Sequence, residues 1–183
     1  EHADVAEAIE RLGELEFERA RYDRARALGE EALAMRRRLL PRDDPRIAES
    51  LDLVALVRRE SGDFAGAGEI HAEALAIRLA TLGESDPATA ESYNYLGIVR
   101  RRSDDLAGAE AAYRKALELW RRSLGGDHPK TAMAMNNLAL TTHLSGDYGG
   151  ALAIFEELVP LRRRLLGDDH PDLLVTLNNQ AKL

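Results

Sequence analysis

The chain has 183 residues and a net charge of −7, with 45% hydrophobic but only 5% aromatic residues. The length suits one domain or a short repeat array, and the negative charge disfavours general binding to nucleic acids or anionic membranes. The absence of cysteine excludes disulfides, thiolate metal sites and cysteine nucleophiles. No apolar stretch is long enough to span a membrane as a helix. Abundant alanine, leucine, arginine and glutamate, all good helix formers, predict an all-α protein.

The chain repeats with a constant period of 42 positions, without insertion or deletion, as four prolines show: Pro45, Pro87, Pro129 and Pro171. Each repeat is predicted to hold two helices. The aspartate before Pro45 or Pro87 can cap the first helix, and Ser-Gly-Asp (61–63) offers a glycine for the turn that follows it. Basic clusters such as 36–38 suit the end of the second helix. In chain order, the predicted repeats cover residues 3–40, 45–82, 87–124 and 129–166, followed by one helix over 171–183.

Three segments carry a resemblance to a known family: DHPKTAMAMNNLA (127–139), SGDYGGALAIFEEL (145–158) and RRRLLGDDHPDLLVTLNNQA (162–181). They resemble tetratricopeptide repeats of the long variety found in kinesin light chains and many bacterial multidomain proteins. The resemblance covers essentially the whole chain as a single array over 1–183. It implies a right-handed α-solenoid of antiparallel helix pairs, nine helices in all, in which neighbouring repeats cover one another. We also expect the chain to be a fragment of a larger multidomain protein.

In arrays of this type the first helices line a concave groove that binds a peptide or a partner's helix. The resemblance therefore implies the following groove residues: Asp52, Arg59, Glu91, Asn94, Ile98, Arg101, Asn136, Leu140, His143 and Asn178. Asparagine is a poor helix former, so its recurrence in the same register of several first helices calls for a reason. One explanation is that the amides bond the backbone of an extended peptide. The other is that they bond neighbouring helices and stabilise the stack.

The sequence contains no recognisable catalytic or cofactor-binding motif. Neither HExxH, GxSxG, a Walker loop nor GxGxxG is present. Among the five histidines, His128 and His170 recur in Asp-His-Pro turns, which predicts a capping role rather than a metal site. We therefore expect no catalytic residue, no metal and no cofactor, and no enzymatic activity.

The main functional hypothesis is a protein-interaction module with a scaffold or recruitment role, whose partner is a protein or peptide. Nucleic acid and membrane are not expected partners, and a cytoplasmic location is expected. The alternative hypothesis is a structural array without an exchangeable ligand. Such an array would pack against other domains of its parent protein or form homo-oligomers end to end through terminal helices, for example through Leu173, Leu174 and Leu177.

Overall fold

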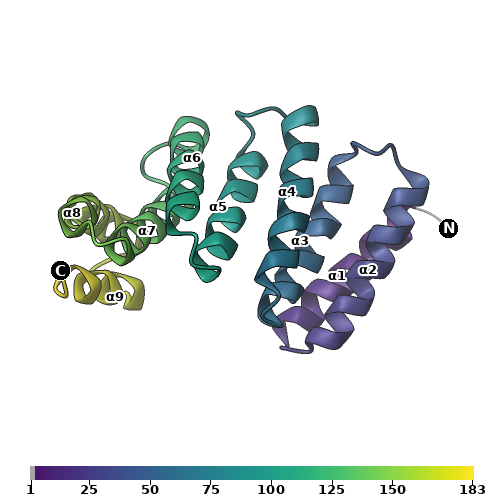
Figure 1. Cartoon of the computed structure of the whole chain (residues 1–183), viewed down its shortest axis with the longest axis horizontal. Coiled ribbons are helices and arrows are strands. Elements are labelled where there is room, and N and C mark those ends of the chain that lie inside the picture. The colour runs from purple at the N-terminus through teal and green to yellow at the C-terminus, as the bar shows by residue number, and fades with distance from the viewer. Residues whose placement is uncertain (1–2) are drawn as a thin grey trace. The chain divides into compact units, whose positions relative to one another are not determined.

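The computed structural model describes residues 3–183, which contain nine α-helices and no β-strand (Figure 1). The prediction of an all-α solenoid made of antiparallel helix pairs is confirmed, and the predicted final helix ends at Gln180. The helices are α1 Ala3–Glu18, α2 Tyr22–Leu39, α3 Pro45–Glu60, α4 Phe64–Thr81, α5 Pro87–Arg102, α6 Leu106–Leu124, α7 Pro129–Leu144, α8 Tyr148–Leu166 and α9 Pro171–Gln180.

The first helix of each later repeat begins at the proline, as predicted. The preceding residue caps the helix, because its side chain accepts a hydrogen bond from the N–H of the residue after the proline. These caps are Asp44, Asp86, His128 and His170, so both histidines have the predicted capping role. Proline at the first helical position costs no backbone hydrogen bond, since that N–H has no partner within the helix. The starts of α3, α5, α7 and α9 are therefore determined locally.

Three of the second helices, α4, α6 and α8, begin by a different local device. Asp63, Asp105 and Asp147 each accept a hydrogen bond from a glycine N–H three residues later. An added Cβ at Gly108 would lie 2.0 Å from Asp105 Oδ2, so glycine leaves room for the capping carboxylate. The turn before each cap uses a left-handed residue, which is Gly62 (φ 83°), Gly146 (φ 87°) or, in the third repeat, Asp104 (φ 64°).

Replacing Asp44 with alanine is expected to lower the free energy of unfolding by about 1 kcal/mol, because α3 loses its N-cap. The side-chain hydrogen bond from Arg46 holds the pKa of Asp44 below its ordinary value of 3.8. The contribution of this carboxylate is therefore present above 3.8 and lost as pH falls through the lower pKa of the folded state. Urea denaturation at neutral pH and in strong acid tests this, with Asp43→Ala as the exposed control. A difference between wild type and Asp44→Ala that persists in strong acid would contradict the assignment.

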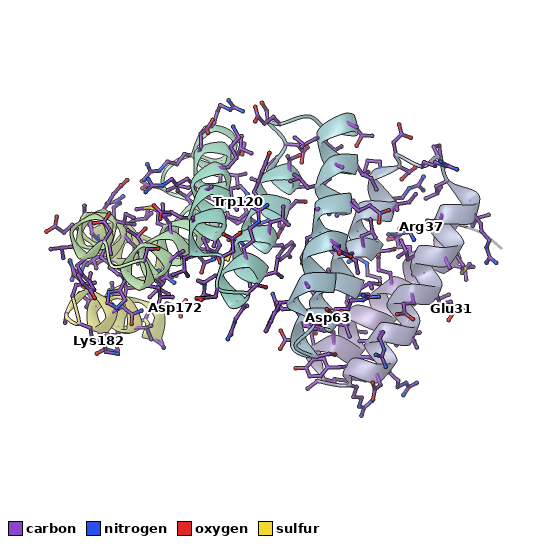
Figure 2. The ribbon with its side chains drawn as sticks, in the orientation of Figure 1. Glu31, Arg37, Asp63, Trp120, Asp172 and Lys182 are labelled. Carbon is purple, nitrogen blue, oxygen red and sulfur yellow. The ribbon has the colours of Figure 1, made fainter. Side chains whose placement is uncertain are left out.

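The helices form two compact units, one ending at Glu84 and the other comprising Ser85–Leu183. We call them the N-terminal unit (α1–α4) and the C-terminal unit (α5–α9). In each, every helix contacts the next one along the chain, and first helices also touch directly, α1 with α3 and α5 with α7. The N-terminal core includes Leu33, Ile47, Leu51, Val54 and Ile77. The C-terminal core includes Tyr113, Leu119, Met135, Leu138, Phe155, Leu158 and, on α6, the fully buried Trp120 (Figure 2).

Candidate functional site

The first helices α5 and α7 of the C-terminal unit lie against each other and form one face, which we call the α5–α7 face. Side-chain contacts join the two helices. Lys130 Nζ lies 2.9 Å from Glu91 Oε2, and Asn137 Nδ2 donates to Asn94 Oδ1 at 3.0 Å. Because α5 and α7 are in direct contact, side chains from both helices can meet one ligand.

Seven of the predicted groove residues belong to these two helices. They lie three or four positions apart, and such positions share one side of a helix. Six of them are half-buried: Glu91, Ile98 and Arg101 on α5, and Asn136, Leu140 and His143 on α7. The seventh, Asn94, is buried.

Three of these half-buried side chains each have a buried polar atom without a hydrogen-bond partner. They are Arg101 Nε, Asn136 Oδ1 and His143 Nδ1. Buried polar groups in folded proteins almost always have partners, and each exception needs an explanation. The N–H of Arg101 is a donor, and the Asn136 oxygen is an acceptor. The α5–α7 face therefore combines half-buried apolar contacts with hydrogen-bonding capacity that the fold leaves unused.

The three predicted groove asparagines, Asn94, Asn136 and Asn178, differ in their burial and in their hydrogen bonds. Asn94 is 2% exposed and bonds Asn137, so the hydrogen bond between stacked first helices that the sequence left open is present here. Asn136 is half-buried, and Asn178 on α9 is exposed. Helix α7 thus uses Asn137 for packing against α5, while Asn136 retains a buried acceptor without a partner.

Replacing Asn137 with alanine is expected to cost about 1.5 kcal/mol of unfolding free energy, because it leaves the buried Asn94 oxygen unpaired. Asn179 is the matched control, since it occupies the same register in α9, is half-buried and has no comparable amide partner among the contacts of the described chain. Urea denaturation of the two variants, followed by circular dichroism, makes the comparison. Equal costs would show that the Asn94–Asn137 bond contributes nothing specific.

In the N-terminal unit, Asp52 is engaged inside the fold. Its Oδ2 lies 2.6 Å from Arg78 Nη1, and its Oδ1 lies 2.9 Å from His71 Nδ1. Both partners belong to α4, and all three side chains are buried. Arg59, the other predicted residue in this unit, is half-buried and pairs with the adjacent Glu60 at 2.8 Å. The Asp52 carboxylate therefore neutralises an arginine of its own repeat.

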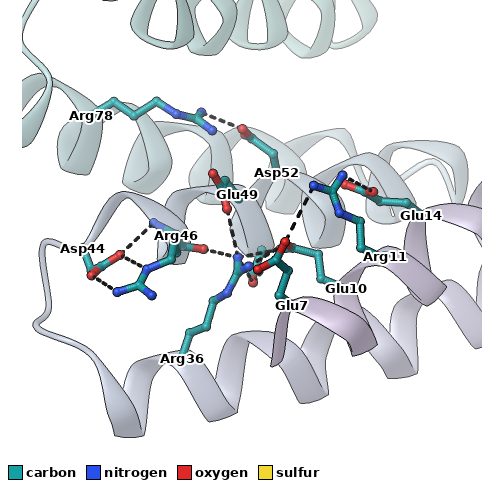
Figure 3. Close-up of polar contacts among 11 residues, drawn as sticks. Glu7, Glu10, Arg11, Glu14, Arg36, Asp44, Arg46, Glu49, Asp52 and Arg78 are labelled. Atoms are coloured by element: carbon teal, nitrogen blue, oxygen red, sulfur yellow. Dashed lines mark hydrogen bonds and ion pairs between the residues drawn. The ribbon is translucent and has the colours of Figure 1, made fainter. Parts of the chain in front are cut away.

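Glu10 occupies the same register in the first repeat and has the same type of partner (Figure 3). Its Oε2 lies 2.7 Å from Arg36 Nη2, and Ser50 donates to its Oε1 at 2.8 Å. Arg36 Nη1 also donates to Ser50 Oγ and Glu49, and to the carbonyl of Arg46. Burial raises the pKa of Glu10, and the hydrogen bond from Ser50 and the charge of Arg36 oppose that rise.

The position of Arg36 recurs every 42 residues along the chain. It is occupied by Arg78, Trp120 and Arg162 in the later repeats. Arg162 donates to Thr176 Oγ1 and to the Asp172 carbonyl of α9, as Arg36 does to Ser50 and Arg46 of α3. Sequence reasoning treated the basic cluster 36–38 as helix-end cations and missed the buried pairs of Arg36 and Arg78. The spacing of acid and arginine could have revealed these pairs. Glu10 precedes Arg36 by 26 positions, and Asp52 precedes Arg78 by the same number.

A polar cavity of about 390 Å³ lies beside the Glu10–Arg36 pair. It is lined by side chains of α1, α2 and α3: Glu7, Glu10, Arg11, Glu14, Arg36, Arg46 and Glu49. Its arginines are already paired, Arg11 with Glu7 and Glu14, and Arg46 with Asp44. The cavity is therefore polar, and the positive charges of its arginines are balanced by carboxylates of the same unit.

None of the helices in the described part of the chain has the length and apolarity needed to cross a bilayer. In residues 3–183, no three histidine, aspartate or glutamate side chains are grouped so that they could hold a metal ion.

The chain matches a known repeat family in sequence and resembles several solved structures in fold. The tetratricopeptide repeat family model matches residues 4–80, 46–119 and 89–164. A kinesin light chain-like protein of Podosopora anserina, with nearly identical TPR-like repeats, is 20% identical, with a TM-score of 0.86 over 100% of this chain and 86% of that one. BtubC of P. vanneervenii is 25% identical, with a TM-score of 0.86 over 98% of this chain and 72% of that one. The apo form of RapI is 16% identical, with a TM-score of 0.78 over 100% and 70%. A search among curated proteins finds no match.

Proposed function

Because the chain belongs to the tetratricopeptide repeat family, whose solenoids generally mediate protein–protein interactions, we propose that its α5–α7 face binds an extended peptide of a partner protein. The observation that carries the proposal is the set of buried polar atoms without partners at Arg101, Asn136 and His143. A peptide backbone offers N–H donors and C=O acceptors at regular intervals, so it can satisfy such atoms after small side-chain movements.

The side chains on this face suggest the chemistry of the peptide. The Arg101 guanidinium suits a carboxylate, either a side chain or a C-terminus, because its planar donors match two oxygens. Ile98 and Leu140 are half-buried and offer apolar contacts beside it. The proposal does not use Asp52 or Asn94, since their oxygens are already bonded within the fold. Arg59 and Asn178 remain predicted contacts for a longer ligand.

In this proposal the segment recruits a partner and has no catalytic activity of its own. The recruitment role and a cytoplasmic location both remain predictions.

A random-peptide phage library, selected on the immobilised full chain, tests the proposal. Selected peptides are synthesised, and their dissociation constants are measured by fluorescence anisotropy. We expect Arg101→Gln and Asn136→Ala to weaken binding by about tenfold, as loss of a central polar contact does. Arg102→Gln is the matched control, because Arg102 is the exposed neighbour of Arg101. Selected peptides that bind wild type, Arg101→Gln and Arg102→Gln equally would place the binding site elsewhere.

A second candidate function is self-association through the last helix. The observation that favours it is the exposure of Leu174 (55%) and Val175 (54%) on α9. Analytical ultracentrifugation of wild type and Leu174→Glu separates the two functions. A dimer that disappears in Leu174→Glu, together with no selected peptide, would favour the structural hypothesis.

A further inference from the structure

The loops before the later first helices share an acidic position, and one of these loops lacks the acid. Asp43, Asp127 and Asp169 occupy this position, two residues before the proline that starts α3, α7 and α9. The loop before α5 has Ser85 at the same place, 42 positions after Asp43 and 42 positions before Asp127. Ser85 is thus the one neutral residue among four equivalent positions of the sequence.

In the fourth repeat this acid forms an ion pair with an arginine of the second helix. Asp127 Oδ1 lies 2.6 Å from Nη2 of Arg164, which belongs to the last turns of α8. Both side chains are largely exposed. The pair therefore joins the loop before α7 to the end of α8 at the surface of the C-terminal unit.

The third repeat has the arginine but not the acid. Arg122 holds the corresponding place in the last turn of α6, 42 positions before Arg164. Its Nη2 donates to Ser85 Oγ at 3.3 Å. Within the described chain no carboxylate pairs with Arg122, whereas its neighbour Arg121 pairs with Glu157 of α8. Loop and helix thus meet as in the fourth repeat, but with a hydroxyl in place of a carboxylate.

The Ser85 hydroxyl is accessible and is not committed to the backbone. Ser85 is exposed and lies in the loop between α4 and α5. In the contacts of the described chain its oxygen accepts from Arg122, and its hydrogen has no acceptor. By contrast, Ser61, Ser123 and Ser145 each donate to the carbonyl of the residue four positions earlier. An enzyme can therefore reach the Ser85 hydroxyl without breaking a helix contact.

A phosphate on Ser85 would have the same type of partner as Asp127. Phosphoserine carries about 1.5 to 2 negative charges at pH 7 and offers three strong acceptor oxygens, and a guanidinium pairs with phosphate through two parallel hydrogen bonds. Because Ser85 Oγ already lies within hydrogen-bond distance of Arg122, a phosphate attached to this oxygen is within reach of the same guanidinium. It would also stand just before the start of α5, where the helix dipole favours negative charge.

Two neighbouring carboxylates oppose this added charge. Glu84 precedes Ser85, and Asp86 follows it and caps α5 by accepting from a backbone N–H. The second repeat shows that consecutive acids fit at this place, since Asp43 directly precedes the capping Asp44. The fold therefore accommodates an anion beside the cap, and in the third repeat Arg122 is in position to compensate it.

We propose that Ser85 is a phosphorylation site and that Arg122 binds the phosphate as Arg164 binds Asp127. Phosphorylation would then fix the loop before α5 to the end of α6, through a contact that the fourth repeat has permanently. Neither Ser85 nor Arg122 belongs to the α5–α7 face, so the inference stands independently of the proposed peptide site.

The reaction needs a protein kinase and a nucleoside triphosphate. Ser85 Oγ attacks the γ-phosphorus, an Oγ–P bond forms, and the bond from the γ-phosphorus to the bridging oxygen breaks. The hydroxyl proton passes to a base of the kinase, and the nucleoside diphosphate leaves with the electron pair of the broken bond. No oxidation or reduction takes place.

Mass spectrometry of the protein isolated from its source cells tests the modification. Trypsin, which cleaves after lysine and arginine, releases residues 79–100 as one peptide, and fragmentation of this peptide separates Ser85 from its other hydroxyl residues. We expect a phosphate on Ser85. A peptide that carries no phosphate, or carries phosphate only on other residues, would overturn the proposal.

A stability measurement tests the contact with Arg122. The full chain is produced with phosphoserine at position 85 by genetic code expansion, and its urea unfolding is compared with that of the unmodified chain. We expect the phosphate to lower the equilibrium constant for unfolding about fivefold, as a well-placed surface ion pair does. Arg122→Gln should abolish most of this gain. Arg164→Gln is the matched control, because it removes the equivalent arginine of the next repeat and should leave the gain intact.

Ser85→Asp examines the same contact with a carboxylate, the group that the other three loops carry. We expect it to lower the unfolding constant about twofold, again only when Arg122 is present, since a carboxylate has less charge than a phosphate. Phosphoserine that destabilises the chain would show that Glu84 and Asp86 outweigh Arg122. That result, or an equal gain in wild type and Arg122→Gln, would overturn the assignment of Arg122.

Discussion

Replacing Glu10 with leucine is expected to lower the free energy of unfolding by about 3 kcal/mol, because it leaves Arg36 buried without its principal carboxylate. Arg36 is 2% exposed, and an arginine does not shed its charge in a protein. Glu49 is the one other carboxylate paired with Arg36 in the described chain, at 3.3 Å, and its side chain is 54% exposed. Partial compensation by Glu49 places the expected loss near the lower end of the range for broken buried pairs.

Urea denaturation followed by circular dichroism measures this loss. Glu14→Leu is the control, because Glu14 lines the same cavity but makes only a partly exposed ion pair with Arg11. The double variant Glu10→Leu/Arg36→Leu should recover much of the stability, since removing both charges also removes the cost of burying one alone. A double variant less stable than Glu10→Leu would show that Arg36 does not depend on Glu10 for its compensation.

Replacing Trp120 with alanine is expected to cost about 4 kcal/mol, because it opens a large cavity in the C-terminal core. Trp120 is fully buried and packs with Ala90, Ala116 and Ala134. These small neighbours leave the space that the indole fills and cannot close it when the ring is removed. The Nε1 hydrogen also donates to the Pro87 carbonyl at 3.1 Å, and this bond is lost as well.

The loss at Trp120 is best measured by circular dichroism, because Trp120 is the single tryptophan of the chain and its fluorescence disappears in the variant. Trp120→Phe should be intermediate, since it keeps most of the buried apolar area but loses the hydrogen bond. Tyr148→Ala is the surface control, because Tyr148 is 57% exposed. A cost for Trp120→Ala as small as that for Tyr148→Ala would mean that the third repeat does not depend on this residue.

The predicted architecture of antiparallel helix pairs is confirmed, and the reason is that the signals that start most of these helices are local. Asp44 or His128 followed by proline starts a first helix through contacts within three residues. Asp63 with Gly66 starts a second helix in the same way. Signals of this kind depend on neighbouring residues alone, so they can be recognised before any tertiary contact is known.

The candidate site was only partly accessible to sequence reasoning. The resemblance placed Arg101, Asn136 and His143 on the first helices, and the structure adds that each has a buried polar atom without a partner. Asp52 and Asn94 occupy the position of Asn136 in the two preceding repeats, and we therefore predicted them to line the groove. Both are buried and bonded to other helices instead. The register of a repeat specifies the side of a helix but not the partner that a side chain finds there.

The sequence by itself determined the period of the repeat, the number of helices in the described chain and the caps before the four prolines. Only the tertiary structure decided that the carboxylates of Glu10 and Asp52 neutralise Arg36 and Arg78 within the stack. Only the tertiary structure, too, shows that Asn137 of α7 donates to the buried Asn94 of α5. The physical reason is range: a cap acts within one helical turn, whereas burial and ion pairing depend on which faces of distant helices meet.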